Sequence, residues 1–400
     1  MTVINSYVNH VSLFLLFSLL ISYSASSKAM EMDHSGHNMG SESEEETGKK
    51  KKVSPWPESD DVDAWADEEF TRDLNEELNT EIGIVVHHQH KSGNWMVSYK
   101  YMSMYMEGLI SGTQEMKDNI PLTTEEVART LMGSTPPATV PGFDYLMAPV
   151  DMKMNMHMLM AMYGLNKNTS LMFMTNYMQN DMNMVMHMGN ETTIAKSNYS
   201  DMATAGISDT GINAMIRASD SWILSFGVSL PTGSIDEDVL MNGNTIQAPY
   251  KMQLGTGTVD FLQAVTYKGG DSSFNWGAQQ NFRYHSGAND NGYVYGNKFE
   301  ISAWLRKTFS NNFSMSTRVN MFDEGQIIGR DVKIMNQTMS PTFAAENSGR
   351  HQVDLSIGFS KRFSSGNRLG VEYSKPIVQL VNGIQMETQY SFTVSWAYMM

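Results

Sequence analysis

Methionine is the residue whose number and spacing in this chain could do chemistry. It accounts for 35 of the 400 residues, and cysteine is absent. The thioether is a soft, uncharged ligand that selects Cu(I), and by the same softness Ag(I), over hard cations. Within one stretch of the chain every methionine falls on an even position: Met152, Met154, Met156, Met158, Met160, Met162, Met172, Met174, Met178, Met182, Met184, Met186 and Met188.

This spacing predicts the element that carries the methionines. Side chains separated by two positions share one face of a β-strand, whereas in a helix they would scatter around the surface. The sequence Asn-Lys-Asn-Thr at residues 166–169 is typical of a turn. We therefore expect a long β-hairpin with a thioether face and an apolar, aromatic face. Around this turn the predicted pairs are Met162 with Met172, Met160 with Met174, Met156 with Met178, and Met152 with Met182.

An earlier predicted strand has the same phase and could extend the thioether face, through Met96, Met102, Met104 and Met106. Three uses of such a face remain open. Repeated weak sites would let a soft metal ion step along it, as conduction requires. The face could instead contact small apolar or aromatic solutes, or serve as flexible apolar packing.

Histidines supply two further candidate metal sites. His34 and His37 lie among methionines in a polar N-terminal stretch, which could capture copper or could be a solvated linker. His88 and His90 share a face at strand spacing, so both could bind one ion; the alternative is that they are polar groups at a barrel rim. Serine and histidine show no spacing that defines a catalytic triad. We expect no catalytic residues, no enzymatic activity and no cofactor other than Cu or Ag as a bound or transported solute.

Composition divides the chain into four parts. Residues 1–29 contain a short apolar run followed by small residues, which predicts a signal peptide, with a membrane anchor as the alternative. Residues 30–59 form a charged Met/His tail that we expect to be disordered. Residues 60–81 are acidic and could form a short amphipathic helix. Most of the net charge of −15 lies in these two segments, and no basic patch indicates nucleic acid.

Residues 82–400 predict a single-chain, all-β transmembrane antiparallel β-barrel of about 12 strands. Apolar and polar residues alternate along each predicted strand, and the aromatic last strand would close the barrel against the first. Tight connections near 166–169, 219–221, 269–272, 311–312 and 365–367 alternate with long ones near 111–151, 190–205, 235–251, 286–292 and 322–349. This alternation predicts short periplasmic turns and long extracellular loops, one with a short helix near 124–132. A soluble β-sandwich is the alternative.

Several motifs resemble one family of bacterial outer-membrane barrels described as transporters and similar to the meta-pathway phenol-degradation family. They are IGIVVHHQHKSGNWMVSYKYMSMYMEG at 82–108, MAPVDMKMNMHMLMAMYG at 147–164, SLPTGSID at 229–236, YKMQLGTGTVDFLQAVTY at 250–267, NWGAQ at 275–279 and NDNGYVYGNKFEISAWLRK at 289–307. The resemblance implies an outer-membrane barrel, and the methionine-rich branch resembles companions of copper-handling systems.

The sequence thus predicts a channel or binding protein in the bacterial outer membrane with its N-terminal tail in the periplasm. Its solute would be copper or silver ions carried on the methionine face. The alternatives are a channel for small apolar or aromatic compounds and a non-conducting structural or metal-sequestering barrel. Expected partners are outer-membrane lipid, the barrel-assembly machinery and the small solute or soft metal ion.

Overall fold

The computed structural model describes residues 82–84, 90, 92–115, 147–190, 193–241, 244–271, 273–310, 312–337, 339–363 and 366–399. Several predicted features lie outside these residues: the signal peptide, the tail with His34 and His37, the acidic segment, His88, and the helix near 124–132. Within them, no helix is long and apolar enough to cross a membrane.

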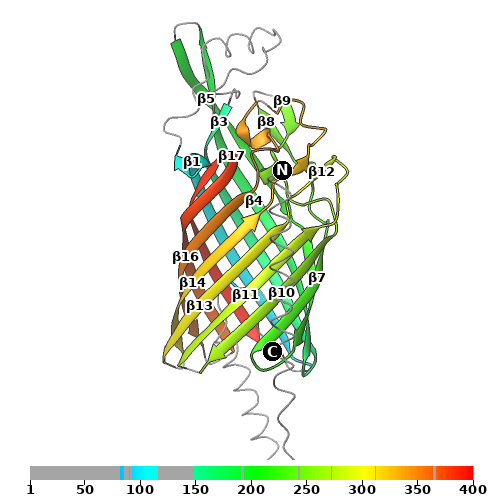
Figure 1. Cartoon of the computed structure of the whole chain (residues 1–400), viewed down its shortest axis with the longest axis vertical. Helices are drawn as coiled ribbons and strands as arrows, with labels where there is room; N and C mark the ends of the chain where they lie inside the picture. Colours follow the sequence, from blue (N-terminus) through cyan, green and yellow to red (C-terminus); the bar gives the residue numbers. More distant parts are fainter. Residues whose placement is uncertain are drawn as a thin grey trace, which may run out of the picture. The chain divides into compact units, whose positions relative to one another are not determined.

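Eleven strands form a closed antiparallel barrel (Figure 1). The sheet closes because β17 hydrogen-bonds both to β16 and to β1. Two more strands belong to the sheet but lie off the ring: β2 (Gln114–Glu115) pairs with β1, and β5 (Thr193–Ile207) pairs with β4. In order around the barrel the eleven are β1 (Trp95–Gly112), β3 (Met147–Asn166), β4 (Thr169–Asn190), β6 (Thr210–Arg217), β7 (Trp222–Leu230), β10 (Asp260–Gly270), β11 (Phe274–His285), β13 (Lys298–Ser310), β14 (Phe313–Glu324), β16 (Arg350–Arg362) and β17 (Asn367–Met399).

Strand β17 is unusual because its two halves pair with different neighbours. Residues 368–381 pair with β16, and residues 381–399 pair with β1. Between the halves, Gly383 has a φ of 62°, a left-handed conformation that glycine adopts at little cost. The sequence pattern also predicts a connection near 382–384, the final one of the chain and an exception to the alternation of tight and long connections, and it falls at this point.

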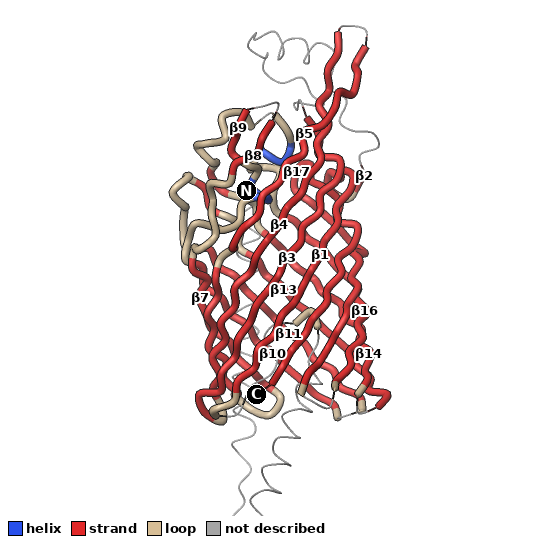
Figure 2. Tube along the Cα trace, turned by 180° about the vertical axis from the view of Figure 1, so that it is seen from behind, coloured by secondary structure: helices blue, strands red, loops and turns tan. Residues whose placement is uncertain are grey.

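The two ends of the barrel differ in the length of their connections. At the turn end, strands follow each other closely, as where β3 ends at Asn166 and β4 begins at Thr169. The chain's C-terminus lies at this end (Figure 1). At the opposite, loop end, the connections carry β8 (Asp238–Met241) paired with β9 (Asn244–Gln247) (Figure 2). They also carry β12 (Tyr293–Val294) paired with β15 (Ile328–Gly329). Two 3-10 turns, η1 (Tyr250–Met252) and η2 (Pro341–Phe343), belong to the same loops.

One predicted loop is instead a strand. The sequence pattern places a long connection near 190–205, but residues 193–207 form β5, which pairs with β4 from Tyr177↔Ile207 to Asn190↔Thr193. The prediction relied on alternating apolar residues, and Lys196, Ser197, Asn198 and Ser200 interrupt that pattern. Backbone pairing in an antiparallel hairpin does not require an apolar face when the hairpin extends beyond the sheet it grows from.

The barrel wall carries apolar side chains outside and polar side chains inside. On β13, for example, Leu305 is 54% exposed whereas the neighbouring Trp304 and Arg306 are 5% and 2% exposed. This arrangement is typical of barrels that lie in lipid and enclose a polar lumen. Every barrel strand contributes to the outward apolar surface, through Tyr99, Leu159, Phe173, Ile212, Phe226, Phe261, Trp276, Leu305, Val319, Leu355, Tyr373 and Phe392.

A short N-terminal segment, residues 82–84, lies inside the barrel. Ile82 and Ile84 are buried, and the Lys100 ammonium on β1 donates hydrogen bonds to their carbonyl oxygens at 2.8 and 3.1 Å. Gly83 lies against the buried Arg318 guanidinium of β14, where a Cβ would collide with it. The segment therefore occupies part of the lumen between β1 and β14.

Candidate functional site: a thioether wall in the lumen

The methionine hairpin has the predicted register. Strands β3 and β4 pair Met162 with Met172, Met160 with Met174, Met156 with Met178, and Met152 with Met182. Strand β1 lies on the other side of β3 and extends the rows, pairing Met96 with Met162, Met102 with Met156, Met104 with Met154, and Met106 with Met152. Directly opposed side chains on one face have Cβ atoms about 4.5–5.5 Å apart, so these thioethers are immediate neighbours.

The methionines point into the barrel. All those of β1, β3 and β4 up to Met184 are buried or half-buried, whereas Leu159 and Phe173, which have the opposite phase, are 50% and 47% exposed. The side chains of Met186 and Met188 lie outside the described residues. The three strands therefore present a continuous thioether wall, which we define as the inward methionines of β1, β3 and β4.

The thioether wall contains three complete rows at different depths. The turn-end row, Met96, Met162 and Met172, is buried, as is the loop-end row, Met106, Met152 and Met182. The middle row, Met102, Met156 and Met178, is only half-buried. Met154, Met158 and Met174 on the same wall are also half-buried. The middle of the wall is thus where a solute in the lumen can reach sulfur.

A polar wall continues around the lumen from the thioether wall. It is formed mainly by β17, which pairs with β1, and by β16, β14 and β13, of which β13 stands opposite β3 in the ring order. Arg318 forms an ion pair with Glu372 at 2.6 Å (Nη2 to Oε1), and Arg306 donates to the hydroxyls of Ser314 and Ser360 at 2.6 and 2.9 Å. All five side chains are buried. One side of the lumen is therefore soft and apolar, and the other is charged and rich in hydrogen-bonding groups.

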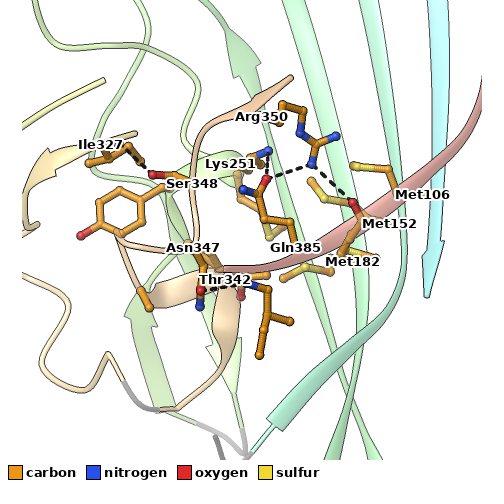
Figure 3. A pocket seen from close by; sticks show the side chains of 16 residues that line it. Met106, Met152, Met182, Lys251, Ile327, Thr342, Asn347, Ser348, Arg350 and Gln385 are labelled. Atoms are coloured by element: carbon orange, nitrogen blue, oxygen red, sulfur yellow. Dashed lines mark hydrogen bonds between the residues drawn. The ribbon is translucent and has the colours of Figure 1, made fainter. Parts of the chain in front are cut away.

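At the loop end the two walls meet around a small cavity of about 40 Å³ (Figure 3). The loop-end row lines one side together with Met252 of η1 and Met386 of β17. Lys251 and Arg350 line the other side, and both donate to the Gln385 side-chain oxygen, at 3.2 and 3.0 Å. The loops that carry η1 and η2 fold inward to complete the cavity, because Tyr250, Met252 and Phe343 are buried with the methionines of the wall.

Sequence reasoning missed Lys251 and Arg350. Arg350 has the same inward phase as Gln352 and Ser356 on β16, so strand alternation contained a signal for it. Lys251 lies in a loop, where no periodicity reports the direction of a side chain.

The described histidines do not join the thioether wall's middle row. His90 is buried near the start of β4, where its backbone N–H donates to the Ser170 hydroxyl at 3.1 Å. His157 has the outward phase, and its Nδ1 is 2.7 Å from the Tyr99 hydroxyl. Throughout the part of the chain that the structure describes, no three His, Cys, Asp or Glu side chains gather as a metal site would require.

Comparisons with known proteins agree with the class that the geometry defines, a β-barrel with a lipid-type exterior and a lined lumen. No family model matches the chain, and no curated protein matches its sequence. Among solved structures, an outer-membrane channel from Pseudomonas putida F1 aligns over 80% of this chain and 100% of its own, with a TM-score of 0.50 and 10% identity.

Two other solved barrels align less well. The CymD monoaromatic hydrocarbon channel covers 77% of this chain and 89% of its own at a TM-score of 0.41 and 8% identity. The P. putida toluene transporter TodX covers 78% and 90% at 0.40 and 7%. At such identities the likeness to the first channel shows the fold alone. The prediction of an all-β antiparallel barrel is confirmed, and the resemblance to a methionine-rich transporter branch stays a prediction.

Proposed function

We propose that this chain is a channel of the bacterial outer membrane that passes small apolar or aromatic solutes, with its N-terminal tail in the periplasm. The proposal assigns it no catalytic reaction. The likeness in fold to a known outer-membrane channel supports the channel class. The choice of solute rests on the lining of the lumen.

The observation that carries the solute class is the two-sided lumen. A small aromatic molecule can lay its ring on the half-buried middle row, since thioethers make favourable contacts with aromatic rings and adapt to irregular shapes. A hydroxyl or other polar substituent on the same molecule can hydrogen-bond to the polar wall. Sugars and hard ions gain little from the thioether wall, so this lining favours amphipathic aromatic solutes.

The outward surface and the strand pairing support a membrane-spanning barrel of twelve passes. Ten strands from β1 to β16 alternate in direction around the ring, yet β17 is antiparallel to both β16 and β1. Both pairings are satisfied when the chain reverses direction near Gly383. Each half of β17 then counts as one pass, which gives the even strand number usual in bacterial outer-membrane barrels.

Uptake of radiolabelled phenol by intact Gram-negative cells tests the proposal, because the lipopolysaccharide leaflet slows passive entry. Cells that contain the chain should take up phenol faster than cells without it, and should take up glycerol no faster. Replacing Met156 and Met178 together by Gln keeps the side-chain size but makes the middle row polar. We expect this double variant to lose most of the gain in phenol uptake.

Ser103→Gln is the matched control, because Ser103 lies beside Met102 on β1 but has the outward phase. It should keep the wild-type rate. Equal phenol uptake with and without the chain would contradict the channel and favour a non-conducting structural barrel.

Soft metal ions are a second candidate, favoured by the middle row itself. Met102, Met156 and Met178 stand abreast on three adjacent strands, and three neighbouring thioethers could bind one Cu(I) or Ag(I) ion. No comparison with known proteins supports copper or silver, so this assignment stays behind the aromatic one.

A sulfur-specific substitution separates the two candidates. Replacing all three methionines of the middle row by Leu keeps the wall apolar but removes the ligand atoms. Silver binding to the purified protein, measured against a competing chelator, should then fall by about tenfold or more, a loss of at least ~1.4 kcal/mol. The Leu variant should lose less phenol uptake than the Gln variant of Met156 and Met178. Unchanged silver affinity in the Leu variant would contradict the assignment of a soft metal ion to the middle row.

A further inference from the structure

The loop-end cavity places two cationic side chains side by side. Lys251 Nζ and Arg350 Nη2 both donate to the same Gln385 oxygen, at 3.2 and 3.0 Å (Figure 3). Arg350 is 7% exposed and also donates to Gln352, Thr388 and the Met386 carbonyl. Each of these acceptors is neutral. The cavity therefore holds positive charge that its own hydrogen bonds do not neutralise.

No acidic group neutralises this charge by direct contact in the described part of the chain. Among the described residues, neither Lys251 nor Arg350 forms an ion pair within 4.0 Å. Glu324 on β14 is opposite Arg350 in the strand register and attracts both cations from a longer distance, and Asp354 on β16 attracts Arg350 in the same way. In addition, Arg350 Nε is buried and has no hydrogen-bond partner. Two like charges in a partly dry site repel each other, and a buried charge without a counter-ion is costly.

We propose that the loop-end cavity binds the carboxylate of a small organic acid, whose apolar body lies against the thioether wall. The carboxylate accepts from Lys251 and Arg350 and supplies the missing negative charge. Arginine and carboxylate form strong charge-assisted hydrogen bonds, which favours this anion over a neutral group. The inference rests on the proposed function and narrows it, because it names anionic aromatic or aliphatic acids among the solutes and gives them a site.

The size and lining of the cavity agree with this ligand class. A single water needs about 10–15 Å³ of such space, so about 40 Å³ holds a carboxylate but not a whole aromatic acid. The remainder of the ligand must leave the cavity along an adjoining surface. Met104 and Met154, one row deeper in the thioether wall, pack against the cluster that forms the cavity. An apolar body can follow that surface into the lumen.

Calorimetric titration of the purified full-length protein in detergent tests the site with three probes of one shape. Benzoate should bind, whereas benzyl alcohol and benzylamine should bind at least about tenfold more weakly, since they lack the negative charge. Acetate should compete with benzoate only weakly, because it has no ring to lie on the thioethers. Equal affinity for benzoate and benzyl alcohol would overturn the anion site, and equal affinity for acetate and benzoate would overturn the role of the thioether wall.

Variants locate the site. Lys251→Met removes one cation from a loop position and should weaken benzoate binding by about tenfold. Lys333→Met is the control, since Lys333 is a loop-end lysine that pairs with Asp236 and does not line the cavity. Unchanged benzoate affinity in Lys251→Met, with intact β-structure by circular dichroism, would overturn the proposal.

Phenol uptake by the wild-type protein distinguishes a failure of the channel proposal from a failure of the carboxylate site. Phenol uptake without benzoate binding would leave the channel standing and remove the anion site. Loss of both would remove both proposals.

Discussion

Lys251 shows how a single residue acquires its chemistry from its surroundings. Its ammonium is held in a loop that folds into the barrel mouth, beside Arg350 and among methionines. Burial lowers the pKa of Lys251 most, the Arg350 and Lys298 charges also lower it, and Glu324 opposes them, so that the pKa is about 7. A lysine in solution has a pKa near 10.4. Lys251 therefore titrates close to neutral pH, where a bound anion would hold its proton.

This shift predicts a pH dependence of stability. Between about pH 7 and 10 the unfolded chain keeps the Lys251 proton and the folded chain releases it, so unfolding takes up protons and the free energy of unfolding rises with pH. Below pH 7 both states are protonated and the fold bears the full cost of the buried charge. Urea unfolding in detergent at pH 7 and pH 9 measures the effect. The wild type should gain more stability over this interval than Lys251→Met, and equal gains would contradict the assigned pKa.

At the scale of elements, the inward loops and the segment of residues 82–84 occupy part of the lumen. Residues 82–84 lie between β1 and β14 and are fastened to Lys100, while η1 and η2 narrow the loop end. Charged donors such as lysine make hydrogen bonds worth about 1.5–3 kcal/mol each, so Lys100 is a strong anchor for a short segment. The strands supply a rigid cylinder, and these shorter elements restrict it.

Loosening that anchor should raise conductance. Lys100→Met removes both hydrogen bonds to the Ile82 and Ile84 carbonyls. The fraction of molecules in which residues 82–84 occupy the lumen should therefore fall by about tenfold or more. Single-channel recordings in planar bilayers should then show larger or more frequent openings than the wild type. Lys307→Met, on the outward face of β13, is the control and should conduct as the wild type does. An unchanged current in Lys100→Met would show that the segment does not limit the pore.

At the scale of the whole molecule, closure of the sheet separates an outward apolar surface from an inward surface that lines the lumen. Outward side chains form an apolar surface on every barrel strand, and inward ones form the thioether and polar walls. A closed barrel satisfies its backbone hydrogen bonds between strands, which is the condition for lying in hydrocarbon. The same alternation that suits lipid outside thus leaves every second residue free to line the lumen.

Replacing one outward residue measures how much the outward face contributes to the folding free energy in lipid. Leu159→Arg places a charge on the outward face of β3 and should cost about 2–4 kcal/mol of folding free energy in lipid if the site lies near the bilayer centre. Asn176→Arg, on the inward face of β4 opposite Met158, introduces the same side chain into the lumen and should cost less. Unfolding in phospholipid vesicles gives both values. Equal losses would argue against a lipid-facing β3.

The sequence by itself determined most of the barrel strands, their phase and the pairing of the methionine hairpin, but it placed a loop where β5 lies. Period-two alternation with a turn at 166–169 was sufficient, because a one-residue change in register would exchange the lumen and lipid faces of every residue. The tertiary structure alone decided what lies across the lumen. Arg350, Lys251 and Met106 come from distant parts of the chain, and only closure of the ring and folding of the loops bring them to one cavity. Alternation states which face a strand residue takes, but it carries no information on loops or on partners across a barrel. The thioether wall can therefore be read from the sequence, whereas the charged cavity beside it can be found only in the tertiary structure.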